Sequence, residues 1–71
     1  MLKPERQLLI LREVNVHNKV LQADLSELLK VSEDTIRRDL QELAEDGKLK
    51  KVRGGAISNS FRMVGAIESE I

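Results

Sequence analysis

Arginine and amide side chains gather on one side of a helix predicted over 33–46. Its apolar side is formed by residues at i, i+4 and i+7, namely Ile36, Leu40 and Leu43. At about 100° per residue, Arg38 and Gln41 lie roughly opposite Ile36, and Arg37 and Thr35 lie to either side of them. Arginine and glutamine fork onto the edges of guanine and adenine, so this polar face suits a DNA major groove.

Both ends of this helix carry recognisable signals. Ser32 is predicted to be the N-cap, because its hydroxyl oxygen can accept a hydrogen bond from an amide of the first turn. Glu33 and Asp34 follow, where the positive end of the helix dipole favours carboxylates. Gly47, after Asp46, is the expected residue just beyond the C-terminal end.

A basic segment follows the helix. Residues 48–53 read Lys-Leu-Lys-Lys-Val-Arg and contain four cations and no anion. The Gly54-Gly55 pair after them predicts a two-residue hairpin turn in which both glycines have positive φ, with a return strand from Ala56. The hairpin is expected over 48–58, and Lys51 and Arg53 are expected to meet phosphate or the minor groove.

Each of these charged sets has a second interpretation. Asp34–Arg38 and Arg38–Glu42 are both i,i+4 pairs, so the arginine could serve only in weak surface ion pairs. Lysines on the hairpin could serve only to protect an exposed strand edge from aggregation. Thr35 and Gln41 could be incidental surface polarity.

Composition limits the class of protein. The chain has 71 residues, 41% of them hydrophobic and 34% charged, which indicates one small globular domain. It has no cysteine, and its single histidine, His17, is expected in a solvated loop rather than as a metal ligand. No apolar run is long enough for a membrane span, so a cytoplasmic location is the default. The zero net charge argues against DNA binding, although the local basic segment permits it.

Two shorter helices and a strand are predicted before the polar helix. Pro4 suits a first helical turn, and the first helix is predicted over 4–14, followed by a loop over 15–18, a brief strand over 19–21 and a second helix over 23–29. Lys30 lies in the turn, where glycine would be cheaper by about 1 kcal/mol if φ is positive. The predicted core consists of Leu8, Leu11, Leu25, Leu28, Ile36, Leu40 and Leu43. Three helices followed by a basic hairpin make a mainly α winged helix-turn-helix.

These residues resemble the N-terminal DNA-binding domain of DeoR-type bacterial transcriptional regulators. The resemblance rests on Val-Ser-Glu-Asp-Thr-Ile-Arg-Arg-Asp-Leu at 31–40 and on Val-Arg-Gly-Gly-Ala at 52–56. It covers about 3–58 and implies a helix-turn-helix at about 20–39. Lys30 stands where the family often has glycine, and Lys51 where it often has arginine. The second departure replaces a planar fork with a point charge.

The resemblance also implies partners. It implies repressors, mostly of sugar and nucleoside catabolism, that bind an operator in double-stranded DNA. It implies a large C-terminal domain that binds a sugar phosphate and forms a homo-oligomer; residues 59–71 would be a linker or the start of that domain, and the chain would be a fragment rather than a truncated paralogue. The expected DNA-binding residues are Ser32, Thr35, Arg37, Arg38, Gln41, Lys51, Arg53, Gly54 and Gly55.

Two other classes of function can be weighed. A winged helix used only for protein contact would suit the zero net charge, but it would not need cations on both the helix and the hairpin. An enzyme would need a nucleophile with its base, a metal cluster or a phosphate loop. The sequence shows none of these motifs, since Gly54-Gly55 lacks the helix and the Lys-Ser/Thr of a P-loop. No cofactor or metal is therefore expected.

Overall fold

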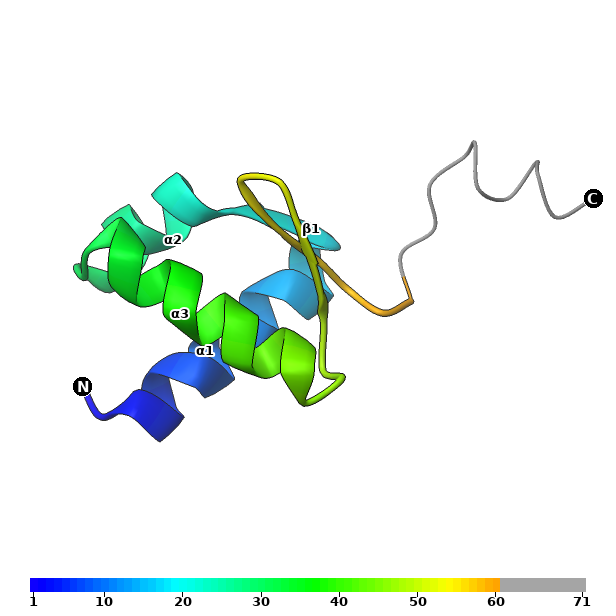
Figure 1. The fold of residues 1–71 in the computed structure, drawn as a ribbon. Coiled ribbons are helices and arrows are strands. Elements are labelled where there is room, and N and C mark those ends of the chain that lie inside the picture. The colour runs from blue at the N-terminus through cyan, green and yellow to red at the C-terminus, as the bar shows by residue number, and fades with distance from the viewer. Residues whose placement is uncertain (61–71) are drawn as a thin grey trace, which may run out of the picture.

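The computed structural model describes residues 1–60, which form three helices and three short strands (Figure 1). The elements are α1 (Lys3–His17), β1 (Lys19–Leu21), α2 (Gln22–Leu29), α3 (Glu33–Glu45), β2 (Lys50–Val52) and β3 (Gly55–Ile57). In Figure 1, α3 crosses in front of α1, and the β2–β3 hairpin rises from the C-terminal end of α3 toward α2 and β1. The predicted winged helix-turn-helix is confirmed. The prediction for 61–71 lies outside the described residues.

One apolar cluster joins the three helices to β1 and β3. Ile36 and Leu40 are fully buried and Leu43 is almost so, which confirms the inner side predicted for α3. Burial of such side chains contributes about 1.5–3 kcal/mol each, so this seam determines which side of α3 faces outward. The other members of the cluster are Ile10, Val14, Val20, Leu25, Leu49 and Ala56.

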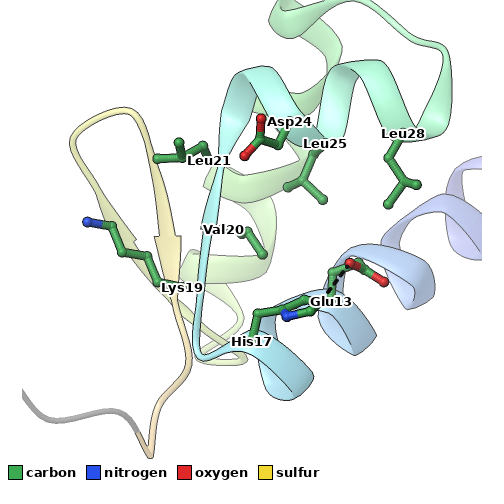
Figure 2. Close-up of a pocket in the computed structure, with 8 residues that line it drawn as sticks. All are labelled: Glu13, His17, Lys19, Val20, Leu21, Asp24, Leu25 and Leu28. Carbon is green, nitrogen blue, oxygen red and sulfur yellow. Dashed lines mark ion pairs between the residues drawn. The ribbon is translucent and has the colours of Figure 1, made fainter.

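Two leucines of the predicted core are exposed. Leu8 is 68% exposed, because the buried side of α1 is set by Ile10 and Val14, which leaves Leu8 on the outer side. Leu28 is 57% exposed and lines an open hollow of about 570 Å³ between α1, β1 and α2 (Figure 2). Leu11 is only partly buried. A run of four apolar residues from Leu8 to Leu11 covers every side of a helix, so spacing alone did not identify the inward side.

The loop predicted over 15–18 is wrong, because α1 continues to His17. Asn18 caps the C-terminal end of α1. Its backbone adopts a left-handed conformation with φ of 68°, and its N–H donates to the carbonyl of Val14. Asparagine tolerates this conformation better than most residues. His17 is therefore the last residue of a helix, where its Nε2 lies 3.4 Å from a carboxylate oxygen of Glu13 (Figure 2).

The predicted brief strand over 19–21 is confirmed, and it joins the hairpin in a three-stranded antiparallel sheet of order β1-β3-β2. Val20 and Lys51 pair with Ala56 from its two sides. Because a lone hairpin is marginal in water, β1 supplies the support that this wing needs.

The turn prediction for the two glycines is partly wrong. Val52 pairs with Gly55, so the two-residue connection is Arg53-Gly54, and of these only Gly54 has positive φ, at 77°. Gly55 is required for a different reason. It is buried in β3, and a Cβ there would lie 2.0 Å from the carbonyl oxygen of Val20.

Lys30 ends α2 in the left-handed conformation, with φ of 60° and ψ of 41°. Because glycine adopts this conformation without a Cβ penalty, Lys30→Gly is expected to raise the free energy of unfolding by about 0.5–1 kcal/mol. Urea denaturation would measure the gain as a higher midpoint with unchanged slope. Lys30→Ala removes the same charge but keeps a Cβ, so an equal gain in that variant would contradict the backbone explanation.

Candidate nucleic-acid interface

The predicted caps of α3 are both present. The Ser32 hydroxyl accepts a hydrogen bond from the backbone N–H of Thr35 at 3.2 Å and donates to the Thr35 hydroxyl at 3.0 Å. At the other end Gly47 has φ of 77°, its N–H donates to the carbonyl of Ala44, and the N–H of Lys48 donates to the carbonyl of Leu43. This paired pattern stops the helix at a defined residue and sets the path into β2.

The polar side of α3 faces solvent as predicted. The Arg38 side chain is 76% exposed and that of Arg37 is 59% exposed. Gln41 is also exposed, and its amide donates to a carboxylate oxygen of Glu45 at 3.1 Å. Of the two predicted arginine–carboxylate pairs, Arg38 with Asp34 forms at 3.1 Å, whereas Glu42 pairs with Lys3 at 2.7 Å.

A shallow groove connects this helix face to the wing. It has a volume of about 350 Å³ and is lined by Arg37, Arg38, Gln41, Glu42 and Lys51. Four of these five are residues predicted to bind DNA, and they come from two elements, α3 and β2. The sequence alone could not place Lys51 beside the helix face, because the two are ten or more positions apart and meet only through the sheet.

Arg6, Gln7 and Asp39 connect α1 to the inner flank of α3. Asp39 is only 2% exposed, and its two carboxylate oxygens accept from the Nε and Nη2 of Arg6, the latter at 2.9 Å. Gln7 donates to the same carboxylate at 3.2 Å. The Arg6 side chain is itself 15% exposed, so this forked contact is a largely buried ion pair. Together with the pair of Lys3 and Glu42, these contacts are called the α1–α3 brace.

The charges of the brace shift two pKa values. The hydrogen bond to Asp39 raises the pKa of the Arg6 guanidinium, which stays charged at every relevant pH. Hydrogen bonds from Lys3 and Gln7 lower the pKa of the Glu42 carboxyl. Since the folded state lowers that pKa, the contribution of Glu42 to stability is present above its ordinary pKa and is lost as the pH falls through the lowered value. It is a small contribution, because the Glu42 side chain is 47% exposed.

Sequence reasoning missed the structural role of Asp39, although a signal for it existed. Asp39 follows Ile36 by three positions, which places it within about 60° of the apolar seam. Arg6 and Gln7 precede Ile10 by four and three positions and so share its side of α1. A carboxylate beside one seam and an arginine beside another indicate a possible bridge between two helices.

Hydrogen bonds hold the wing against the ends of the helices. The N–H of Gln22 donates to the carbonyl of Gly54 at 2.8 Å, the N–H of Ser58 donates to the carbonyl of Asn18 at 2.8 Å, and the Asn59 amide donates to the carbonyl of Gly47 at 2.7 Å. Arg53 and Gly54 are exposed in the turn, whereas Gly55 is buried and presents no surface for a ligand.

Within residues 1–60, no cluster of three or more potential metal-ligating side chains occurs. None of the helices there has the length and apolar character needed to cross a membrane. What the described surface offers is an exposed helix face with two arginines, next to a strand that carries a lysine.

Comparison with known proteins places this surface in context. A family model for the DeoR-like helix-turn-helix domain matches residues 6–62. The chain is 50% identical over 56 residues to the HTH-type transcriptional regulator FruR of Bacillus subtilis, covering 79% of this chain and 22% of that protein. It is 49% identical over 51 residues to the lactose phosphotransferase system repressor of Staphylococcus epidermidis, covering 72% and 20%. The L-fucose operon activator of Haemophilus influenzae is 41% identical over 61 residues, covering 86% and 24%.

These matches concern one part of longer proteins, since the chain spans about a fifth to a quarter of each relative. No solved structure matches the chain. The family match nevertheless extends from α1 through the wing and includes every residue of the groove between α3 and β2. By sequence and by fold, the chain belongs to the DeoR family of helix-turn-helix domains.

Proposed function

We propose that the chain binds double-stranded DNA sequence-specifically, as the DNA-binding domain of a bacterial transcriptional regulator that represses genes of sugar or nucleoside catabolism. The observation that supports this most is the groove in which the exposed face of α3 meets Lys51 of the wing. A recognition helix in the major groove with a cation beside it supplies both base contacts and phosphate contacts. The relatives named above include a repressor of a sugar phosphotransferase system and an activator of a sugar operon.

The proposed roles follow the geometry of each residue. Arg38 and Gln41 read base edges, Arg37 flanks them, and Lys51 and Arg53 contact phosphate or the minor groove. Ser32 and Thr35 lie at the N-terminal end of α3, and their hydroxyls are proposed to contact the DNA backbone. The domain acts by binding and not by catalysis, and in the cytoplasm, where the bacterial chromosome lies. Homo-oligomerisation and binding of a sugar phosphate are proposed for the remainder of the protein.

The test is selection of duplexes from a random pool with the 71-residue chain, followed by titration of the enriched and a scrambled duplex across a salt series. Sequence-specific binding predicts enrichment of a defined sequence and tighter binding of that duplex at every salt concentration. A single module of this kind buries only roughly 600–1,000 Å² on DNA, so the selection is best done at low salt. Failure to enrich any sequence would favour the alternative, a winged helix that contacts only protein. The zero net charge of the chain is the observation that supports this alternative.

Lys51→Ala should weaken binding of the enriched and the scrambled duplex alike and reduce the slope of log affinity against log salt by about one. The reason is that a lysine at the rim of the groove acts as a point charge toward phosphate and carries no base information. Fluorescence anisotropy on both duplexes would measure it. A selective loss on the enriched duplex would show instead that the wing reads sequence.

A further inference from the structure

Arg37 and Arg38 share one carboxylate. One oxygen of Asp34 accepts from Nη2 of Arg37, and the other lies 3.1 Å from Nη2 of Arg38. Each arginine therefore has its own oxygen, and the two guanidinium groups are held toward the same point. The Asp34 side chain is 49% exposed, so this three-residue cluster faces the solvent that a bound duplex would displace.

The carboxylate lies in the part of α3 that would be nearest to the bases. Asp34 belongs to the first turn of the helix and lies about 160° from the buried Ile36 around the helix axis. In helix-turn-helix proteins the N-terminal residues of the recognition helix contact the base edges. The helix dipole favours a carboxylate in this turn, but a negative charge at this position is unfavourable for simple attraction to DNA.

We propose that Asp34 is a specificity-determining residue, which holds Arg37 and Arg38 away from phosphates and so selects against DNA whose bases do not satisfy them. This inference rests on the proposed function. Binding to random DNA depends on phosphate contacts. Asp34 holds both guanidinium groups toward the base side of the groove, so a guanidinium must leave Asp34 to reach a phosphate at the edge of the groove. The carboxylate then faces the anionic backbone without that partner, within a screening length of about 10 Å at 0.1 M salt.

Matching DNA avoids this cost. A guanidinium carries five N–H donors, and Arg38 approaches Asp34 through its Nη2. The remaining donors can fork onto guanine while the contact with Asp34 persists, so the carboxylate stays paired. Asp34 also restricts the long Arg38 side chain to one region before binding, which reduces the entropy lost on the correct sequence. The penalty therefore falls mainly on incorrect sequences.

The test variant is Asp34→Asn in the 71-residue chain, titrated with the enriched and the scrambled duplex across a salt series. One freed arginine should reach phosphate, and that one extra phosphate contact, at a slope of about 0.9, corresponds to roughly eightfold tighter binding of scrambled DNA at 0.1 M salt. The enriched duplex should gain much less, so the ratio of the two affinities falls. The salt slope on scrambled DNA should steepen by about 0.9.

Glu33→Gln is the matched control. It removes the same charge from the same first turn of α3, but Glu33 accepts from the Gln22 amide at 3.3 Å and contacts neither arginine. Its effect should be a general one on both duplexes, with their affinity ratio unchanged. If Asp34→Asn preserves the wild-type ratio, or lowers it no more than Glu33→Gln does, the role of Asp34 is refuted while sequence-specific binding stands. If the wild-type chain enriches no sequence, the proposed function itself fails.

Discussion

Replacing Asp39 with alanine is expected to lower the free energy of unfolding by about 3–5 kcal/mol, the cost of leaving one member of a buried ion pair without its partner. Asp39 is 2% exposed and forms a forked contact with Arg6, whose side chain is 15% exposed. The substitution leaves the guanidinium of Arg6 without its acceptor between α1 and α3, and it leaves the amide of Gln7 with Glu42 as its remaining acceptor. Urea denaturation followed by circular dichroism would measure the loss.

Glu42→Gln is the control for this prediction. Glu42 lies three residues further along α3 and pairs with Lys3, but its side chain is 47% exposed, so its loss should lower the free energy of unfolding much less than the loss of Asp39. Arg6→Met combined with Asp39→Leu should recover most of the stability, since an apolar pair of similar volume often replaces a buried ion pair without loss. An Asp39→Ala variant as stable as Glu42→Gln would show that the brace contributes little.

Arg38→Ala is expected to remove most of the discrimination between the enriched and the scrambled duplex. An arginine that forks onto guanine contributes about 1–3 kcal/mol of discrimination, which is roughly 5- to 150-fold in the affinity ratio. Arg38 is the more exposed of the two arginines and lies on the outer face nearly two turns beyond the Ser32 cap. The salt slope should fall by about one or less, because the guanidinium of Arg38 mainly binds a base rather than a phosphate.

Arg12→Ala is the control for loss of an exposed arginine. Arg12 lies on α1, does not line the groove between α3 and Lys51, and is not one of the residues of the α1–α3 brace. It should leave the affinity ratio unchanged. The competing interpretation of Arg38 is an ion pair with Asp34 alone, worth only a few tenths of a kcal/mol of helix stability. That interpretation predicts that Arg38→Ala keeps full discrimination between the two duplexes. If Lys51→Ala also loses discrimination, the wing and not α3 reads the DNA sequence.

The amino-acid sequence determined by itself the elements whose signals are local. The Ser32 cap, the Ile36–Leu40–Leu43 seam and the Gly47 stop define α3 within a single stretch, and the structure agrees with its predicted bounds to within a residue. The cap and the apolar seam together also determine that Arg37, Arg38 and Gln41 face outward. On a helix, the residues that face the core determine which other residues face solvent.

Tertiary structure decided what depends on residues far apart in the chain. It selected Ile10 and Val14 over Leu8 as the inward side of α1, since the apolar run from Leu8 to Leu11 covers every side of the helix and only tertiary packing distinguishes them. It buried Asp39 against Arg6, 33 positions away, and placed Lys51 beside Arg37 through the β1-β3-β2 sheet. It also explains why position 55 requires glycine, because a Cβ there would clash with the carbonyl of Val20, whereas the turn does not require a glycine at this position. Each of these outcomes is a long-range contact, and local periodicity contains no information about which distant residue will be the partner.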